Sequence, residues 1–373
     1  TYKIQIMRRF VFVLSLLGLL VGCNRSNPTY EAFFLDTSAR EDFALSDIVE
    51  SVDVLFLNET DDVLVGKVSD VRYANNRWYL LDVDEGRSVV SVFDKEGNAL
   101  GQLNRQGRGP KEYLEIASFD VCPKTGDIYL GCYPPKVMVF DKELNLKREI
   151  ECEAPYMGIA KCGDGLMLYG FVARDSAGVD YMKLGSGEEV SVERVKSWRR
   201  EKNATETIGK NTFMRSAENI YFYTQNSDSL YLADDGNLSV VAAIDYPNRE
   251  QIRAYRRTHS IYDLPPMERK EYFVPRVHYA MERGGGLWLH YSNVLFGYGV
   301  VAKEGVKNYS SKCLDATSLC GNRLVNIVEA FRYDPENFDP NGWLQGVKIN
   351  HIKLNDTQRE SGNKVLIIYN LRD

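Results

Sequence analysis

The stretch that decides the fold is residues 68–103, VSDVRYANNRWYLLDVDEGRSVVSVFDKEGNALGQL, because its pattern returns at residues 116–150 as IASFDVCPKTGDIYLGCYPPKVMVFDKELNLKREI. Both copies contain the run Val-Phe-Asp-Lys, at positions 92–95 and 139–142. Each copy holds short runs of β-forming residues separated by turn residues, and the spacing of roughly 50 residues is typical of propeller blades. The sequence therefore predicts an all-β fold, a β-propeller of four-stranded antiparallel blades.

A shorter core of this repeat, a turn followed by a bulky β run, can be followed along most of the chain. The runs end at Tyr79, Tyr129, Met167, Tyr221 and Trp288, so the intervals between them are 50, 38, 54 and 67 residues. With a mean of about 52 residues per repeat, the pattern favours six blades with two insertions, and seven blades are the alternative.

The two ends of the chain are expected to meet in one blade. Residues 46–57, SDIVESVDVLFL, alternate in polarity like a strand, and the last β run is KVLIIY at 364–369. We expect the final blade within residues 323–373, with the N-terminal strand closing the ring and removing its exposed sheet edges. The propeller is therefore predicted to be a single domain over residues 43–373.

The N-terminal region predicts export and a lipid anchor. Residues 1–22 have the pattern of a signal peptide, of which 1–6 precede the true start, and the apolar run at 10–21 is short for a membrane span. The run ends in LVGC, which resembles the lipobox of bacterial lipoproteins, in which Cys23 would be acylated and become the new N-terminus. Residues 23–42 are polar and irregular and predict a lipidated tether. The alternative is an ordinary secretory signal followed by an accidental cysteine.

Composition and charge argue against nucleic-acid binding. The net charge is −6, and removal of the first 22 residues, which contain Lys3, Arg8 and Arg9, changes it to −9. Nonspecific nucleic-acid binding needs basic surface, so this class of function is disfavoured. The 23 tyrosines and 16 phenylalanines suit strands better than helices.

The six cysteines after Cys23 show no CxxC spacing, so a zinc ribbon or a thioredoxin-type site is not expected. Cys122 and Cys162 occupy equivalent points of successive repeats, which predicts inward packing of a small apolar side chain. Cys313 and Cys320 are the most plausible disulfide pair.

The order of these features resembles the six-bladed β-propeller lipoproteins of Bacteroidota, which are similar in pattern to NHL-type propellers. The matching pieces are the lipobox, DIVESVDVLFLNETDDVLVGKVSDV at 47–71, GRGPKEY at 107–113, the VFDKEGN turns and NKVLIIYNL at 363–371. The resemblance implies a fold and an envelope location. It implies no catalytic residues.

The segment QGRGPKEY, which separates the two repeats, is the first candidate for a site. It lacks the GK[ST] of a P-loop, so we expect a connection between blades in which Gly107 and Gly109 adopt positive φ and Tyr113 packs between sheets. Such connections reach one rim of a propeller. Arg105, Arg108 and Lys111 are therefore candidates to face a ligand, and a purely structural role is the alternative.

Metal, cofactor and catalytic motifs are not recognisable. DVDEG at 82–86 and DDGN at 234–237 have some calcium-loop character but lack the full spacing, so turns are expected. The four histidines have no metal-ligand spacing, and His290 reads as a core or rim residue within a strand. We expect no metal and no cofactor, and we assign no catalytic residue.

The longest departure from the repeat is the predicted insertion at 247–283. Its first part, Arg249 to Tyr262, lacks glycine and proline and predicts a helix with a basic side. The residues proposed to face a partner or ligand are Arg253, Tyr255 and Arg256, since Arg and Tyr are enriched at binding hot spots. The alternative is that the helix covers a sheet edge and its arginines pair with the protein's own acidic residues.

These observations predict a lipid-anchored protein of the Gram-negative envelope, on the outer membrane and facing the periplasm. Its propeller would serve as a binding platform for an envelope protein or a glycan. The alternative function is a lyase or hydrolase acting on glycans or peptides at the propeller mouth, which would require clustered carboxylates, histidines or a metal at the centre of the ring.

Overall fold

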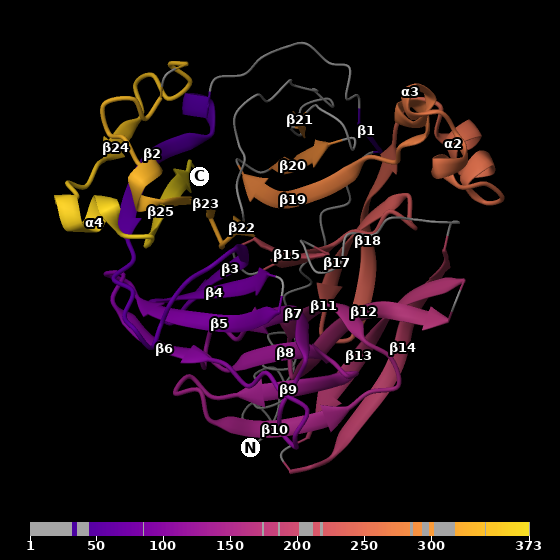
Figure 1. Ribbon diagram of the computed structural model, residues 1–373. Helices are drawn as coiled ribbons and strands as arrows, with labels where there is room; N and C mark the ends of the chain where they lie inside the picture. Colours follow the sequence, from indigo (N-terminus) through magenta and orange to yellow (C-terminus); the bar gives the residue numbers. More distant parts are fainter. Residues whose placement is uncertain are drawn as a thin grey trace, which may run out of the picture.

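The computed structural model describes residues 32–35, 45–84, 86–173, 175–185, 187–200, 212–216, 219–283, 286–292, 298–301, 318–339 and 341–372. Among these residues the strands form six sheets, which follow one another around a common centre (Figure 1). Five sheets have four or five strands, and three strands are described in the remaining one. The predicted all-β propeller fold is confirmed.

The two clear repeats form the first two sheets. Their strands are β3 (Val68–Ala74), β4 (Arg77–Asp84), β5 (Arg87–Asp94) and β6 (Ala99–Leu103), then β7 (Glu115–Val121), β8 (Ile128–Tyr133), β9 (Lys136–Phe140) and β10 (Leu146–Glu151). In both sheets the strands pair antiparallel in chain order, because each is joined to the next by a short turn.

Three further sheets follow in chain order. The third sheet contains β11 (Tyr156–Cys162), β12 (Gly165–Ala173), β13 (Ser176–Leu184) and β14 (Val190–Arg199). The fourth contains β15 (Phe213–Ser216), β16 (Asn219–Phe222), β17 (Ser229–Asp234) and β18 (Asn237–Asp245). The fifth contains β19 (Arg276–Arg283), β20 (Gly286–Ser292) and β21 (Tyr298–Val301). The five turn-plus-run units recognised in the sequence all fall on the second strand of a sheet, namely β4, β8, β12, β16 and β20.

The last sheet joins the two ends of the chain, as predicted. Its order is β22 (Ser318–Leu319), β23 (Arg323–Glu329), β25 (Lys364–Leu371), β2 (Val49–Phe56) and β24 (Lys348–Asn350). The N-terminal β2 pairs antiparallel with the C-terminal β25, with Leu55 opposite Leu366. The expected start of this blade at residue 323 was wrong, because the short β22 precedes it and pairs with β23.

Part of the predicted tether is packed onto the propeller. Within residues 23–42, β1 (Phe33–Phe34) pairs in parallel with β18, and Phe33 and Leu35 are buried in the core beside Ile244. The prediction of an irregular tether up to residue 42 was therefore wrong at these residues. Two large apolar side chains in a polar segment stabilise its docking by their burial.

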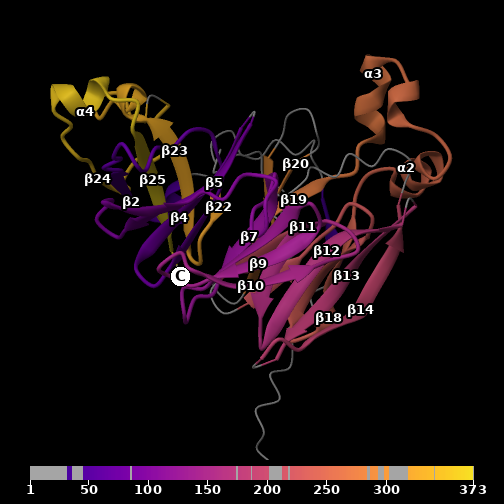
Figure 2. The ribbon, with the colours of Figure 1, turned by 60° about the horizontal axis from the view of Figure 1, so that its bottom comes forward.

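The predicted insertion contains short helices but ends earlier than expected, because β19 begins at Arg276. It holds α2 (Arg249–Arg256), η2 (Ile261–Asp263), α3 (Pro266–Arg269) and η3 (Lys270–Tyr272). The helix predicted to reach Tyr262 stops at Arg256, since Ser260 caps a new helical turn in a reciprocal capping box with Asp263. Figure 2 shows α3 and α4 (Asp356–Glu360) projecting from the same side of the molecule at opposite ends.

The core lies between neighbouring sheets. The interface between the first two sheets buries several large aromatic side chains, among them Tyr79, Tyr113, Phe119 and Phe140. Successive side chains of a strand point to opposite faces of its sheet, and the side chains on the faces between the two sheets form this interface. None of the described helices is long and apolar enough to span a membrane.

Closure by β2 can be tested by deleting residues 43–58. The deletion would leave the edges of β25 and β24 unpaired, so we expect aggregation or oligomerisation and not a mild loss of stability. Size-exclusion chromatography and thermal melting would measure the effect. Glu50→Ala, which changes an exposed side chain of the same strand, is the control. A truncated protein that stays monomeric and melts like the wild type would contradict the role of β2.

Candidate functional site

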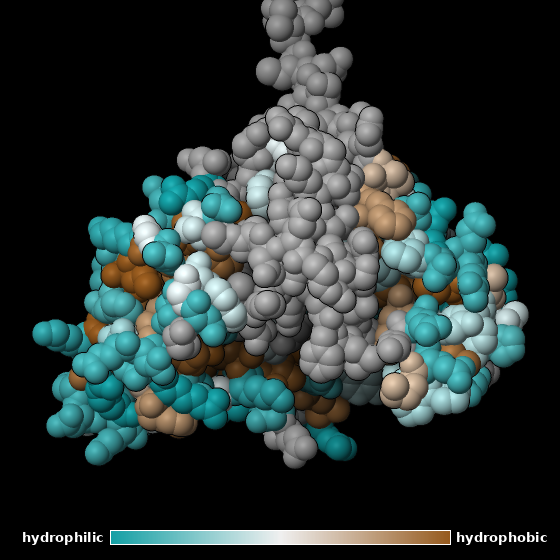
Figure 3. Space-filling model, turned by 90° about the horizontal axis from the view of Figure 1, so that it is seen from above, coloured by the Kyte–Doolittle hydropathy of each residue, from teal (hydrophilic) through white to brown (hydrophobic). Residues whose placement is uncertain are grey.

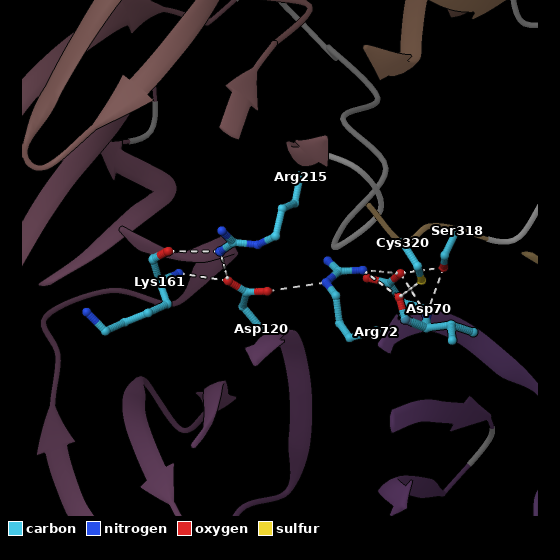
Figure 4. A network of polar contacts seen from close by, with 8 residues as sticks. Asp70, Arg72, Asp120, Lys161, Arg215, Ser318 and Cys320 are labelled. Atoms are coloured by element: carbon cyan, nitrogen blue, oxygen red, sulfur yellow. Dashed lines mark hydrogen bonds and ion pairs between the residues drawn. The ribbon is translucent and has the colours of Figure 1, made fainter. Parts of the chain in front are cut away.

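A chain of charged side chains crosses the centre of the ring. It is built on the first strands of five sheets, β3, β7, β11, β15 and β22, whose inner positions bring them close together. Figure 4 shows the Asp120 carboxylate between the guanidinium groups of Arg72 and Arg215, with Asp70 on one side and Lys161 on the other.

The contacts of this central charge network are short and mostly charge-assisted. The Asp120 carboxylate accepts from Arg72 Nε at 3.3 Å, from Arg215 Nη2 at 2.8 Å and from the Lys161 backbone N–H at 2.8 Å. Arg215 also donates to the Lys161 carbonyl, at 2.8 Å. Because each of these hydrogen bonds joins different strands, the network ties β3, β7, β11 and β15 together.

The network continues from Arg72 to the last sheet. Arg72 Nη1 donates to Asp70 Oδ1 at 2.6 Å, and the same oxygen accepts from the Ser318 hydroxyl, also at 2.6 Å. The Cys320 thiol donates to the Val71 carbonyl at 3.4 Å. The first sheet and the last sheet are thus joined by side chains as well as by packing.

The charges in the network hold one another in the ionised form. Burial alone would raise the pKa of the Asp120 carboxyl group, but Arg215 and Arg72 outweigh it, so the pKa lies below its usual value. Burial alone would lower the pKa of Arg72, and Asp70 and Asp120 raise it instead. A general acid needs a pKa near the working pH, so Asp120 is not prepared for that role. The arrangement suits a structural clamp.

Sequence reasoning missed this network. Its signal is a charged residue inside a short apolar run, as in SDVR at 69–72, SFDV at 118–121 and FMRS at 213–216. A buried charge in such a run requires a partner, but the partner can lie far away on another sheet, 95 residues for Asp120 with Arg215 and 248 residues for Asp70 with Ser318. The repeat pattern alone cannot identify it.

The segment between the first two repeats borders a cavity, here called the rim cavity. A cavity of about 460 Å³ is bounded by residues 102–106 at the end of β6, by residues 110–112 and by Leu144. Of the three candidates, Arg105 and Lys111 line this cavity, whereas Arg108 is exposed and does not line it. Arg105 also lies over the Phe140 ring, 5.6 Å from its centroid, which fixes the direction of its side chain.

The glycines of this loop serve a different purpose from the one predicted. Positive φ occurs at Lys111, at 61°, and not at Gly107 or Gly109. A Cβ atom at Gly107 would collide with the Glu112 carboxylate, which accepts from the Gly109 N–H at 2.7 Å. The glycines therefore leave space for the Glu112 carboxylate, which hydrogen-bonds within the loop.

Packing of Tyr113 between sheets is confirmed. Its side chain is fully buried in the interface between the first two sheets, and its hydroxyl donates to the Ser88 carbonyl at 2.9 Å. Burial raises the pKa of this phenol above its usual value. The loop is thus held in place by a buried anchor below the cavity.

The arginines of α2 that were proposed to face a partner point into the protein. Arg253 is 8% exposed and donates to Asp228 Oδ1 at 2.5 Å and to the Gln225 carbonyl at 2.7 Å. Arg256 is 2% exposed and donates to the Tyr272 carbonyl at 3.3 Å. Tyr255 is half-buried and packs against Tyr272. These contacts favour the alternative in which the helix arginines pair with the protein's own groups.

The remaining sequence motifs are structural. The acidic segment at 82–86 begins within β4, which ends at Asp84, and DDGN at 234–237 lies at the β17–β18 turn. The described residues contain no group of three or more potential metal ligands. His290 is buried, and burial together with His278 lowers its pKa to about 3. Cys122 and Cys162 are buried as predicted, and Cys320 is a free buried thiol. Its suggested partner, Cys313, lies outside the described residues, as does Cys23.

The fold and the site define a β-propeller with a charged ring centre and a polar cavity beside the loop that joins its first two sheets. The chain belongs to the family described as Domain of unknown function (DUF4934), whose sequence profile matches residues 33–370. No curated protein matches the sequence.

Solved structures with similar folds include a protein of Bacteroides fragilis that is predicted to be exported. It has a TM-score of 0.62 at 16% sequence identity, over 92% of this chain and 99% of that protein. BamB of Moraxella catarrhalis has a TM-score of 0.39 at 9% identity, over 70% of this chain and 66% of that one. The β-propeller domain of Cps50 (Swd1) from Myceliophteria thermophila has a TM-score of 0.38 at 13% identity, over 67% and 87% respectively.

The structural role of the network can be tested with Asp120→Asn. Removing the carboxylate charge leaves the largely buried Arg215 without its carboxylate partner and Arg72 with Asp70 alone, so we expect the free energy of unfolding to fall by about 3 kcal/mol. Chemical denaturation would measure this loss. Asp127→Asn is the matched control, because its ion pair with the exposed Lys147 should contribute less than about 1 kcal/mol. Equal stability of the two variants would contradict the role of the clamp.

The same variant should change the response to acid. Because the pKa of Asp120 is lower in the folded state, its contribution is present above the unfolded value of about 4 and is lost as the pH falls through the folded value. We expect Asp120→Asn to lose less stability than the wild type between about pH 5 and pH 2.

Proposed function

We propose that this chain is an exported, lipid-anchored protein of the Gram-negative envelope whose propeller is a binding platform. In this proposal the six sheets are six blades of an NHL-like ring, and β19–β21 is the blade with three described strands. The anchor is Cys23, on the outer membrane facing the periplasm. The partner is an envelope protein or a glycan.

The rim cavity between the first two blades is the observation that carries the binding role. Its volume of about 460 Å³ falls within the usual range for ligand pockets, roughly 300–1,000 Å³. It is lined mainly by amide and charged side chains, namely Gln102, Asn104, Arg105, Gln106, Lys111 and Glu112. Such a lining suits a polar ligand that forms many hydrogen bonds, as a sugar or a polar peptide segment does.

The side chains of this cavity divide into fixed and available groups. Gln102 donates to the Leu64 carbonyl at 2.8 Å, and the Gln106 side chain accepts from the Ser88 N–H at 2.8 Å. Both amides are therefore held in place. Arg105 and Lys111 form no ion pair within the described part of the chain. They are the groups best placed to meet a ligand.

A binding role has more support than a catalytic role at the ring centre. The two carboxylates there, Asp70 and Asp120, are both committed to Arg72, and the pKa of Asp120 is lowered. A lyase or hydrolase at the propeller mouth would need a carboxyl group with a raised pKa or an unpaired base among these residues. The described central residues supply neither of these.

The envelope location is supported by the sequence and by one fold likeness. Figure 3 shows hydrophilic side chains around the periphery of one face, with hydrophobic areas between them. The fold likeness to a Bacteroides fragilis protein that is predicted to be exported is consistent with an envelope location. The lipobox-like LVGC supports anchoring through Cys23.

Lipid attachment can be tested with Cys23→Ala in the native host. Loss of the thiol removes the acyl anchor, so we expect the protein to move from the membrane fraction to the soluble fraction. Fractionation followed by immunoblotting would show the shift, and Cys152→Ala, which changes a half-buried cysteine of the propeller, is the control. Intact-mass data showing an unmodified mature Cys23 would contradict the anchor.

The rim cavity can be tested with the double variant Arg105→Gln and Lys111→Gln. We expect it to capture clearly less of the partner when cross-linked in native envelopes and identified by mass spectrometry, since two ligand-facing cations are lost. Thermal stability should stay within about 1 kcal/mol of the wild type, because both groups lack ion pairs.

Lys124→Gln with Lys353→Gln is the charge-matched control for this experiment. Both lysines are exposed, and neither lines the rim cavity. If the control loses the partner as strongly as the cavity variant, the effect comes from net charge and the cavity is not the binding site.

A further inference from the structure

A second cavity, separate from the rim cavity, lies where β14 meets the helical insertion. Its volume is about 210 Å³, and it is enclosed by three segments of different origin. They are the end of β14 with residues 198–200, the β16–β17 turn with Asn226 and Asp228, and α2 with Arg253 and Arg257. The cavity exists because the insertion folds back over the fourth sheet.

Positive charge dominates the lining of this β14–α2 cavity. Four arginines face one carboxylate, that of Asp228. This carboxylate is already committed, because Arg253 donates to it at 2.5 Å and Arg249 lies 3.8 Å from it. The cavity therefore holds an excess of positive charge in a protein whose overall charge is negative.

The four arginines fall into two pairs. Arg253 is held by Asp228, and Arg200 lies over the Phe171 ring, 3.9 Å from its centroid. Arg199 and Arg257 are exposed, and neither forms an ion pair with any acidic residue in the described ranges. Two guanidinium groups from different elements thus line one cavity, and neither is paired with its one carboxylate, that of Asp228.

The walls of the cavity are packed against the body of the propeller. Trp198 stacks on Phe222 at 5.6 Å between ring centroids and meets Tyr231 edge-on at 5.7 Å. On the other side, α2 is fixed by the buried Arg253 and by Ile252, which packs in the core. The backbone segments that carry Arg199 and Arg257 are thus fixed by packing, and the ordering needed when a ligand binds is confined to the two arginine side chains.

Guanidinium groups select oxyanions, because their planar N–H donors match the oxygens of a carboxylate, sulfate or phosphate. A volume of about 210 Å³ is below the range for drug-sized ligands, so it admits one anionic group with a small attached unit such as a sugar ring. The flat indole of Trp198 provides an apolar wall against which such a ring can pack.

From this geometry we infer that the β14–α2 cavity is a binding site for an oxyanion group, either free or carried on a sugar. Arg199 and Arg257 clamp this group from opposite sides. Arg200, Asn226 and Trp198 complete the site. Anion binding at this cavity requires neither a ligand in the rim cavity nor a lipid on Cys23.

The experiment is isothermal titration of the intact propeller with four probes at constant ionic strength. The probes are inorganic phosphate, inorganic sulfate, glucuronate and glucose 6-phosphate, and glucose serves as the neutral comparison. We expect saturable binding of at least one anion and no binding of glucose. Tighter binding of glucuronate or glucose 6-phosphate than of the inorganic ions would identify a sugar-borne anion, and the reverse order would identify a free ion.

The variant that tests the assignment is Arg199→Gln with Arg257→Gln. It should weaken anion binding by about tenfold or more, because it removes both uncommitted donors. Its melting temperature should be unchanged, since neither side chain is buried. Lys353→Gln with Arg359→Gln is the charge-matched control, on exposed residues in and beside α4, across the molecule from α2 (Figure 1). The control should bind like the wild type.

Two results would overturn the inference. One is the absence of saturable binding of every anion to the wild-type protein. The other is equal binding by the wild type and the Arg199–Arg257 double variant, which would place the anion elsewhere. If the double variant melts at a lower temperature, the single variant Arg257→Gln gives the decisive comparison, because it leaves β14 intact.

Discussion

The carboxylate of Asp120 is shared by Arg72 and Arg215, and the packing of the ring depends on this interaction. Removing two arginines and two aspartates from water is costly, and only mutual pairing with additional hydrogen bonds offsets that cost. The Lys161 amide and the Ser318 hydroxyl supply those bonds. The first strands of the sheets therefore cannot shift independently, since any displacement leaves a buried charge without its partner.

At the outside of the ring, too, segments that are far apart in the sequence are joined, here by strand pairing. The last sheet contains β2 from the beginning of the chain and β25 from its end, and β24 adds a further parallel edge to β2. The fourth sheet is extended in the same way by β1. Most contacts that hold the ring closed thus join residues far apart in sequence, so the blades are expected to unfold together and not one by one.

The sequence predicts the parts of the structure that repeat. Second strands are recognised because a turn precedes a bulky run, and β2 is recognised because ring closure requires a strand there. Short strands are not recognised from the sequence, because β1, β22 and β24 have only two or three residues and no usable periodicity. The direction of long side chains cannot be predicted either. Helical periodicity placed Arg253 and Arg256 on a basic surface, but their partners Asp228 and Tyr272 come from other elements.

The rim loop can be predicted from the sequence, whereas the β14–α2 cavity cannot. Local sequence is sufficient to place Arg105 and Lys111 at a rim, because the loop joins two adjacent repeats. Arg199 and Arg257 are 58 positions apart in the sequence, and only the folding of the insertion over the fourth sheet brings them to one cavity. No pattern in a single sequence encodes that meeting.

The docking of β1 would limit the distance between the propeller and any membrane that held a lipid on Cys23. With Phe33 paired to β18, ten residue steps separate it from Cys23, so the connection spans at most about 35 Å when fully extended. A free segment up to residue 42 would have allowed nearly twice that reach. A lipid on Cys23 would therefore keep the outer edge of the fourth sheet close to the bilayer, and the ring would search a thin layer of the envelope for its partners.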